Sequence, residues 1–545
     1  MRLGRFLMLL LLPAGMLTAQ TVMLPIRHPV YDYLDRVETR YGHGLPSFVR
    51  PLSREDVARH LDQLRRRSDL ARYDVVALAY YAEEFREELH RLTMQDTSVT
   101  VPAEGRWHLL QVRGGGVVEG YLAVDLVAGG MFEMRQEADD LFQRNSGIDA
   151  HGYAAGSLGF QLRWTDNARR GEAYDARGYR TPVQGVVRGP GSSTDFQYEI
   201  AEGQFTWSNA WVRIGLDKLD RWQGSGRDGS IILSDKVPSF PALSLQVRIT
   251  DWLHLDAFHG WLFSDTIDVA RTGNGLPGFE TQKMYAGKYL ASHALTARVT
   301  PTLQIAIGES IIYSDQLHPL FLIPVISYRA ADRWTRASMG NAQFHADVRY
   351  TPMRGLTLYG SGFVDELDAS KVFSSNTVGS DYHVAYTIGA TATDLHAMLT
   401  GMASESRIEF SRVYPYVYTN PKTAQQYTSH QVVLGHWIGA NADMLTLEHV
   451  LHPMRALELR LAATYLRFGE GREFIDMQTR IQPAFLYDYE FSALRVAGAV
   501  HWRPWHDVQV SAMLVHTMLR KGPGYAGSTI PIGTTLAVGA SYGIH

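Results

Sequence analysis

One stretch of the chain, residues 211–245, gathers side chains suited to recognising a sugar. An indole ring stacks on the C–H face of a sugar, and a guanidinium fork donates hydrogen bonds to hydroxyl or acid groups. The stretch also holds four glycines, and a structural loop held by Arg–Asp pairs explains its composition equally well. The candidate carbohydrate-binding residues are Arg213, Lys218, Asp220, Arg221, Trp222, Arg227 and Asp235.

Evidence for catalysis is weak. The sequence has no His-Glu-x-x-His pair and no P-loop, and without cysteine it has neither thiolate metal ligands nor a cysteine nucleophile. A hydrolase needs a histidine beside a Ser or Asp, and His293, His318 and His345 are available. However, 21 histidines in 545 residues produce such pairs by chance. We therefore expect no enzyme activity, no metal and no cofactor.

The elements that position these residues follow from a polarity pattern with a period of two. Residues 243–249, LSLQVRI, place Leu, Leu, Val and Ile on one face and Ser, Gln and Arg on the other. The alternation resumes after Asp251 and Trp252, which predicts two strands joined by a tight turn. Because Arg248 is costly to bury in a dry core, the polar face of this hairpin must meet water.

The hairpin pattern recurs along the chain. Strand, tight turn and strand appear again at 298–305, 349–358, 450–459 and 501–510, separated by longer polar stretches. A repeat of about 50 residues with one short turn and one long loop is typical of a transmembrane β-barrel, whereas a propeller blade fits four strands into that length. At ~25 residues per strand, residues 101–545 predict an all-β transmembrane barrel of about 18 antiparallel strands. Its apolar side chains would face lipid, and its polar side chains would face a wet lumen.

Two other segments precede the predicted barrel. Residues 1–19 carry Arg2 and Arg5 before a short apolar run, which predicts a signal peptide and export to the outer membrane. Residues 20–100 show helical periodicity, with Ser53 as an expected N-cap, and predict a small helical bundle that plugs the periplasmic end. No later segment reaches the ~20 apolar residues of a transmembrane helix.

The charge balance argues against a nucleic-acid partner. The chain has 52 basic and 56 acidic side chains, and loss of the two signal-peptide arginines leaves a net charge of −6. Such a chain lacks the basic footprint of a nucleic-acid-binding protein. Capture of an acidic polymer would need a local basic patch, and residues 162–190, with six arginines, are a candidate outer loop of that kind.

The order of these features resembles the Wzi-type capsule-assembly outer-membrane proteins. Residues 211–245 are similar to that family's strand, Trp-Gly step, Gly-rich turn and Leu-Ser-Asx step. The match departs at Leu216, where the family has the arginine of a Gly-Arg pair, and at Gln223, which interrupts Trp-Gly. Residues 288–334 are similar to its Lys…His, Gly-Glu-x-x-x-Tyr and Pro pattern, and residues 30–45 resemble its opening helix. The family-motif residues are Gly215, Gly224, Ser234, Lys288, His293, Glu309, Tyr313 and Pro324.

The resemblance implies an 18-stranded outer-membrane barrel with a periplasmic helical bundle. It also implies a lectin-like, non-catalytic role in holding capsular or exopolysaccharide at the cell surface. The expected partners are outer-membrane lipid, the polysaccharide and the polysaccharide export machinery, and we expect a monomer. Two alternatives stay open: a passive porin or sugar transporter with an open lumen, and an outer-membrane hydrolase.

Overall fold

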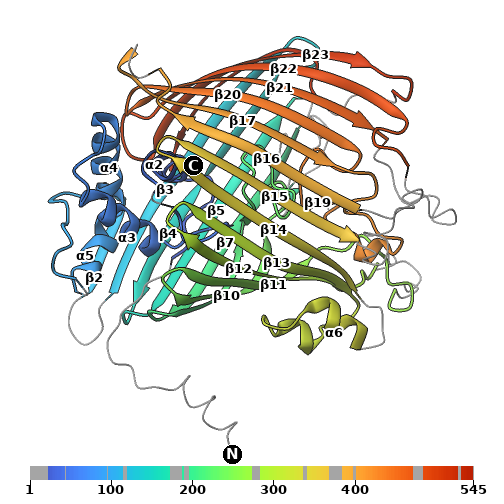
Figure 1. The fold of residues 1–545 in the computed structure, drawn as a ribbon, viewed down its shortest axis with the longest axis horizontal. Helices are drawn as coiled ribbons and strands as arrows, with labels where there is room; N and C mark the ends of the chain where they lie inside the picture. Colours follow the sequence, from blue (N-terminus) through green and yellow to red (C-terminus); the bar gives the residue numbers. More distant parts are fainter. Residues whose placement is uncertain are drawn as a thin grey trace, which may run out of the picture.

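A computed structural model shows a closed β-barrel with a group of helices at one end (Figure 1). It describes residues 22–42, 44–94, 96–114, 120–171, 187–188, 195–272, 283–334, 340–366, 383–396, 400–470, 483–525 and 530–543. The predicted signal peptide, residues 1–19, lies outside this range. Among the described residues, no helix is both long enough and apolar enough to cross a membrane.

Eighteen antiparallel strands form the ring, which confirms the predicted fold class. β24 pairs with β3 and closes the barrel, while β2 (Leu110–Gly114) and β6 (Val187–Arg188) are short additions beside β3 and β7. The ring strands are β3 (Gly120–Arg135), β4 (Leu141–Ala154), β5 (Leu158–Arg170), β7 (Asp195–Ser208), β8 (Val212–Leu219), β10 (Phe240–Thr250), β11 (Leu253–Leu262), β12 (Lys288–Thr300), β13 (Leu303–Ser314), β14 (Gly340–Met353), β15 (Leu356–Glu366), β16 (His383–Thr393), β17 (Ala403–Val413), β20 (Ala442–Met454), β21 (Leu457–Gly469), β22 (Tyr489–Trp502), β23 (Val508–Lys521) and β24 (Gly533–Tyr542).

The connections at the two ends of the barrel differ in length. At one end, turns such as residues 251–252 and 301–302 join strands directly, whereas residues 220–239 and 414–441 are long connections at the other end. Outer-membrane barrels have short periplasmic turns and long outer loops, and the prediction of a periplasmic helical bundle would place the short-turn end in the periplasm. The helices lie at this short-turn end, on the left of Figure 1.

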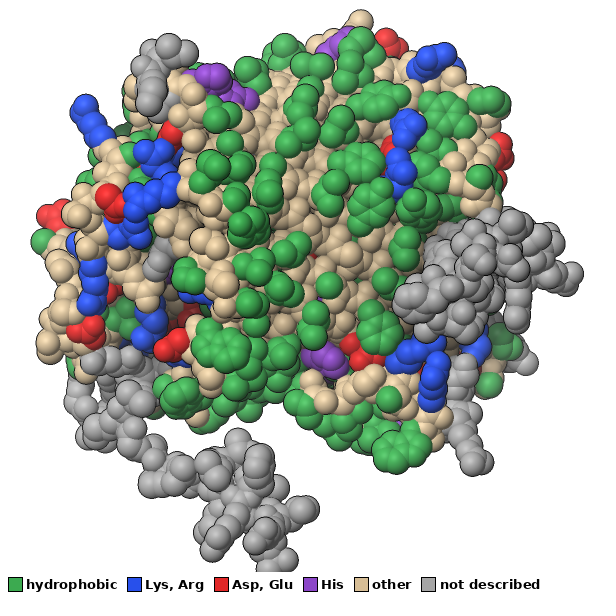
Figure 2. All heavy atoms as spheres, viewed as in Figure 1, with side chains coloured by type: hydrophobic (Ala, Val, Ile, Leu, Met, Phe, Trp, Pro, Cys, Tyr) green, Lys and Arg blue, Asp and Glu red, His purple; other side chains and the backbone are tan. Residues whose placement is uncertain are grey.

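The barrel wall is inverted relative to a soluble protein. Leu243 and Ile249 of β10 point outward and are 43% and 44% exposed, while the Ser244 hydroxyl points inward and donates to Asp217 at 2.7 Å. Hydrophobic side chains accordingly cover the outer face of the strands (Figure 2). Lipid cannot pair with backbone groups, so the closed ring is what satisfies them.

The helices before the barrel pack around a core of their own. They are α2 (Val30–Tyr41), α3 (Arg54–Arg65), α4 (Arg72–Glu84) and α5 (Arg86–Leu92), and buried Leu34, Val57 and Leu61 belong to their shared apolar cluster. The Ser53 hydroxyl accepts a hydrogen bond from the Asp56 backbone N–H at 3.0 Å, which confirms the predicted N-cap of α3.

Ion pairs fix this helical group to the barrel wall. Glu38 of α2 accepts hydrogen bonds from Arg349 of β14 at 2.9 and 3.0 Å. Arg36 of α2 donates to Asp74 of α4 at 2.8 Å and to Asp394, beside β16, at 3.0 Å. A buried charge without its partner raises the free energy of the fold, so these pairs favour a single position of the helices against the wall.

Two further segments enter the lumen from the long-loop end. We call them the β8–β10 segment (residues 220–239) and the β17–β20 segment (residues 414–441). Ile231 and Leu434, one from each segment, are fully buried in one apolar cluster, and the Ser234 hydroxyl donates to the Gly435 carbonyl at 2.7 Å. The β17–β20 segment also forms a small hairpin of its own, β18 (Thr428–Ser429) with β19 (Val432–Val433).

The helical end and the long-loop end are joined inside the barrel. β1 (Val49–Arg50), just before α3, pairs antiparallel with β9 (Trp222–Gln223) of the β8–β10 segment. Backbone from the short-turn end therefore bonds to backbone from the long-loop end within the lumen.

We predict that a charge on the lipid-facing wall destabilises the barrel. Leu447 points outward from the middle of β20 and is 49% exposed. Leu447→Arg should lower the free energy of unfolding by about 2–4 kcal/mol, because the guanidinium would sit in hydrocarbon. Equilibrium guanidinium unfolding in lipid vesicles measures the effect, with Leu447→Ala as the size control. Equal stability of the two variants would contradict the inverted wall.

Candidate functional site

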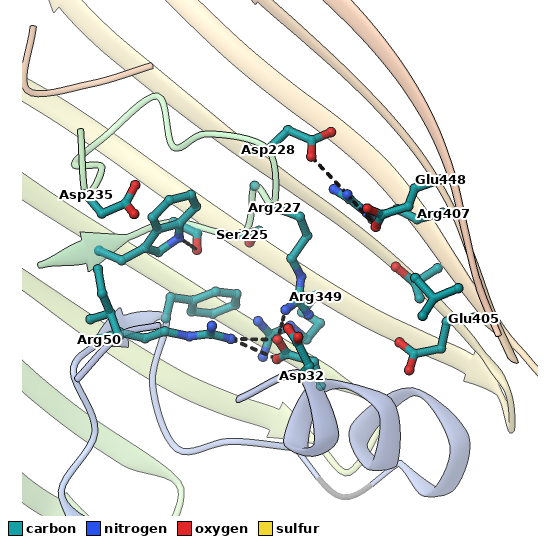
Figure 3. Close-up of a pocket in the computed structure, with 18 of the residues that line it drawn as sticks. Asp32, Arg50, Ser225, Arg227, Asp228, Asp235, Arg349, Glu405, Arg407 and Glu448 are labelled. Carbon is teal, nitrogen blue, oxygen red and sulfur yellow. Dashed lines mark hydrogen bonds and ion pairs between the residues drawn. The ribbon is translucent and has the colours of Figure 1, made fainter. Parts of the chain in front are cut away.

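A charged cavity of about 240 Å³ lies inside the barrel, where three parts of the chain meet (Figure 3). The helical end supplies one side, the β8–β10 segment supplies the second, and lumen-facing side chains of the strands supply the third. Trp222 is the aromatic residue of the β8–β10 segment at this cavity. The charged residues that line it are Asp32, Asp35, Arg50, Arg227, Asp228, Asp235, Arg349, Glu405, Arg407, Glu448, Glu458 and Arg460.

Asp35 of α2 joins the helical end to the β8–β10 segment. Its carboxylate accepts from the Arg50 guanidinium at 2.8 and 2.9 Å and forms an ion pair with Arg227. The Arg50 guanidinium also lies 4.6 Å from the centre of the Tyr31 ring. Figure 3 shows Arg227 reaching from the β8–β10 segment toward the helix that carries Asp32. One carboxylate thus holds two arginines from different parts of the chain.

Arg407 of β17 holds the other side of the cavity. It donates to Asp228 at 2.9 Å and to Glu448 of β20 at 2.8 Å. The backbone N–H groups of Arg227 and Asp228 donate to Glu409 of β17 at 2.8 and 3.0 Å. Burial acts to raise the pKa of the Asp228 carboxyl, but the Arg407 guanidinium outweighs it, so that pKa is lowered.

The size of the cavity limits what it can bind. Ligand pockets usually measure ~300–1,000 Å³, so 240 Å³ holds water or one sugar-sized group and not a polymer chain. Its charges of both signs are largely paired with each other. Its guanidinium and carboxylate groups could hydrogen-bond to sugar hydroxyls. In the fold, these groups connect the interior segments to the wall through ion pairs.

The structure brings together three of the seven residues predicted to bind carbohydrate. Trp222, Arg227 and Asp235 line the charged cavity. The Trp222 indole N–H donates to the Gly224 carbonyl at 3.3 Å, and Asp235 accepts from the Arg27 guanidinium at 3.2 Å. Each of these groups therefore already has an internal partner.

The other four predicted residues lie outside the charged cavity, although Arg213 and Arg221 line a smaller cavity of about 40 Å³ together with Trp222. Arg213 is buried in the wall at β8, and the Lys218 ammonium donates to the Ala201 carbonyl at 2.8 Å. Arg221 forms an ion pair with Asp217 and lies beneath two rings, 5.0 Å from the centre of Phe258 and 5.5 Å from that of Phe240. The fourth residue, Asp220, lies at a second cavity, which is described below. Lys218 and Arg221 therefore have partners within the protein, whereas the buried Nε and Nη1 atoms of Arg213 have no hydrogen-bond partner in the described part of the chain.

Asp220 lies at a second interior cavity, of about 210 Å³, which Arg27 and Glu202 also line. Burial and the neighbouring Glu202 carboxylate raise the pKa of Asp220 to about 7. This carboxyl therefore changes its charge near neutral pH.

Three of the family-motif residues belong to β8 and the β8–β10 segment. Gly215 lies in β8, Ser234 anchors the segment to Gly435, and Gly224 follows β9 with a φ of +127°. A side chain at Gly224 would meet the Ser230 hydroxyl at 2.5 Å as well as straining the backbone, so glycine is required there.

Four of the remaining five family-motif residues lie along β12 and β13, and Pro324 lies in the segment that follows β13. Lys288 donates to the Thr428 hydroxyl at 3.0 Å inside the barrel. His293, Glu309 and Tyr313 instead face away from the lumen, beneath the segment that contains Pro324. The sequence pattern that groups these residues did not indicate that His293, Glu309 and Tyr313 face outward from the wall.

Residues 162–190 do not form the predicted outer loop throughout. Residues 162–170 belong to β5, which pairs with β4 and β7 in a regular ladder. The prediction is wrong for that part because alternating Leu, Arg and Trp side chains fit a strand whose two faces differ. Residues 172–186 and 189–190 lie outside the described residues.

No catalytic arrangement emerges among the described residues. Residues 539–543 read Gly-Ala-Ser-Tyr-Gly, the spacing of a hydrolase elbow, but Ser541 lies in β24 and pairs with both β23 and β3. A nucleophile elbow instead needs a sharp strand-to-helix turn. In the part of the chain that the structure describes, no three His, Asp or Glu side chains are placed to hold a metal ion.

Several residues of the charged cavity escaped the sequence analysis. Asp35, Arg349, Arg407 and Glu448 come from four different elements, and only the fold brings them together. A signal did exist: Arg349 and Arg407 occupy polar positions of alternating strands, which predicts that they face the lumen. The alternation did not specify their partners.

Comparisons with known proteins establish the fold but no family. No protein-family model and no curated protein matches the chain. A solved structure described as Wzi, an outer-membrane protein involved in group 1 capsule assembly in Escherichia coli and a carbohydrate-binding β-barrel, matches with a TM-score of 0.59. The match has 11% identity and covers 96% of this chain and 100% of that one.

Porin structures match less closely. OprD from Pseudomonas aeruginosa gives a TM-score of 0.41 at 9% identity, covering 77% of this chain and 92% of that one. OccAB2 from Acinetobacter baumannii gives 0.44 at 10% identity, covering 77% and 97%. At these identities the likeness concerns the outer-membrane barrel fold alone.

We predict that Asp220 makes stability depend on pH. Because the folded state raises this pKa from 3.8 to about 7, the folded state holds the proton more tightly. The contribution of Asp220 to the unfolding free energy should therefore fall as pH rises from 4 to 8. Relative to the parent, Asp220→Asn should gain stability between these pH values by on the order of 1 kcal/mol. Guanidinium unfolding at both pH values checks this, with the exposed turn variant Asp251→Asn as control. The same pH dependence in the parent and in Asp220→Asn would contradict it.

Proposed function

We propose that this protein is an outer-membrane barrel that binds and retains capsular or exopolysaccharide at the cell surface without catalysis. The observation that carries this proposal is the filled lumen. The helical end and the β8–β10 segment meet through the β1–β9 pairing, and both are tied to the wall by ion pairs. With its interior occupied, the barrel offers its long-loop end as a surface for a polymer.

The filled lumen weighs against the passive porin or sugar transporter. A porin conducts through a continuous water-filled channel along the barrel axis. Here two of the interior cavities measure about 240 and 210 Å³, and the buried cluster around Ile231 and Leu434 lies between the wall strands on the extracellular side. A binding role therefore accounts for the interior better than a transport role does.

The long-loop end carries a set of exposed aromatic rings suited to a sugar. We call Phe263, Tyr285 and His430 the outer aromatic platform. The rings of Phe263 and His430 are stacked at 4.3 Å between centres, and those of Phe263 and Tyr285 lie 5.6 Å apart. Phe263 and Tyr285 are 41% and 44% exposed. Aromatic faces flanked by polar groups such as Asp265 bind the C–H face of a sugar.

In this proposal, the residues that the sequence analysis selected for carbohydrate binding have a structural role. Trp222 and Arg227 line a cavity too small for a polymer, and Arg221 is paired with Asp217 beneath two phenylalanine rings. Their contacts favour a role in holding the β8–β10 segment, while direct contact with carbohydrate stays a prediction. Docking of export machinery on the helices and a monomeric state also stay predictions.

We predict that the outer aromatic platform retains polysaccharide. The double variant Phe263→Ala/Tyr285→Ala should weaken binding of the producing strain's own acidic polysaccharide by about tenfold, because exposed aromatic anchors carry much of such binding energy. A pull-down with detergent-purified protein measures this, with Trp505→Ala, exposed at the opposite end, as the matched control. Trp222→Ala in the same assay tests the inner residues. Unchanged binding by the double variant would contradict the platform.

We predict that the intact protein does not form large, steady channels. The interior segments block the axis, so planar-bilayer recordings should show no stepwise conductance of the porin kind. An outer-membrane porin reconstituted in parallel provides the positive control. Steady channels from the intact protein would favour the transport alternative.

A further inference from the structure

The outer wall carries polar side chains where lipid is expected. Ser292 of β12 faces the lumen and contacts Gln223, so His293 next to it points outward. Glu309 of β13 pairs directly opposite His293, and Tyr313 lies on the same outward face. A carboxylate exposed to hydrocarbon would be costly, so this patch requires a cover.

The chain supplies that cover from its own long connection. We call residues 315–334 the external segment; it contains the short 3-10 helix η2 (Pro319–Leu322) and α6 (Tyr328–Trp334), and it lies outside the strands (Figure 1). The Glu309 carboxylate accepts from the first backbone N–H groups of α6, those of Tyr328 at 3.0 Å and Arg329 at 2.6 Å. The Ser327 hydroxyl adds a third bond at 3.2 Å.

Aromatic contacts hold the inner side of the external segment. The Phe321 ring lies 4.6 Å from the Tyr313 ring, and the Tyr328 ring lies 4.6 Å from the His293 ring, measured between centres. Tyr313 is fully buried, and its hydroxyl lies 2.6 Å from the His259 ring nitrogen. The external segment is thus a docked part of the fold.

The opposite side of the external segment is apolar and has no protein cover among the described residues. Val325 is 77% exposed and Trp334 is 82% exposed, and Leu322 and Ile323 are exposed beside them. In water such a patch would be unfavourable, but this one lies on the lipid-facing wall, where amphipathic segments bury apolar side chains in the membrane boundary. Hydrophobic side chains extend over this region in Figure 2.

A groove of about 470 Å³ opens between α6 and β14. Its lining combines Arg329 and Arg333, one helical turn apart, with Trp334 and the outward-facing Phe344 of β14. Among the described residues, no ion pair involves either arginine. The groove therefore offers two guanidinium groups beside an apolar floor that is continuous with the lipid-facing wall.

We propose that this groove binds a phosphorylated lipid of the outer leaflet. The guanidinium groups of Arg329 and Arg333 hold the phosphate through charge-assisted hydrogen bonds, and the acyl chains run along Phe344. The external segment starts where β13 ends at the long-loop end, which places the arginines at the headgroups of the outer leaflet. The occupant is a membrane lipid because the groove faces the bilayer side of the wall.

Native mass spectrometry of the full chain, purified in detergent, tests the proposal with bis-phosphorylated lipid A as probe. We expect the double variant Arg329→Gln/Arg333→Gln to bind it about tenfold more weakly than the parent, because two charge-assisted contacts are lost. Arg354→Gln, exposed at the opposite end of the barrel, should bind as the parent does. Dephosphorylated lipid A should bind the parent as weakly as the phosphorylated form binds the double variant.

Two outcomes of this experiment would overturn the proposal. One is equal binding of lipid A by the parent and the double variant. The other is equal binding of phosphorylated and dephosphorylated lipid A by the parent. Heat-modifiable migration on gels shows whether each variant keeps a folded barrel, and the polysaccharide pull-down is independent of this result.

A second measurement tests the position of the external segment. The chain has no cysteine, so Val325→Cys can be labelled at one site with an environment-sensitive dye. In vesicles containing lipid A, we expect the emission of this dye to shift to the blue, as in an apolar medium. Lys422→Cys, exposed in the β17–β20 segment, should report water. A water-like emission from position 325 would overturn the proposal.

Discussion

The structure depends on one constraint: no backbone polar group can face hydrocarbon without a partner. Only a closed ring of strands meets this constraint with strands, and the pairing of β24 with β3 completes it. Closure turns the usual arrangement inside out, because Leu243 and Ile249 must then face lipid while Ser244 faces inward. It also creates a polar interior wide enough to need filling.

Ion pairs and a buried apolar cluster together fill the interior. Glu38 with Arg349, and Asp35 with Arg227, each connect an element of the helical end to another part of the chain. Buried ion pairs contribute little net stability once desolvation is counted, but an unpaired partner is strongly unfavourable. Such pairs therefore specify one placement of the interior segments. The groups that suit a sugar, guanidinium and carboxylate, are the same groups that suit this task.

The outer wall carries a covered polar patch where β12 pairs with β13. Glu309 and His293 face outward, and the external segment covers them by donating its helix N–H groups to the carboxylate. The sequence pattern that contains both residues thus marks a docking point on the membrane side of the barrel. Successive side chains of a strand face opposite sides of the wall. One sequence pattern can therefore contain residues that face the lumen and residues that face outward.

The sequence by itself determined the class of fold, because alternation of polarity, short turns and a repeat of about 50 residues are local properties. It also located the helices, including the cap at Ser53. The tertiary structure alone decided what the polar side chains contact. The side-chain chemistry of Trp222 and Arg227 suits a sugar. In the fold, however, Arg227 forms an ion pair with Asp35, and Trp222 lies beside β1. The physical reason is that a side chain's chemistry is local, whereas its partner is set by how distant strands close into a ring.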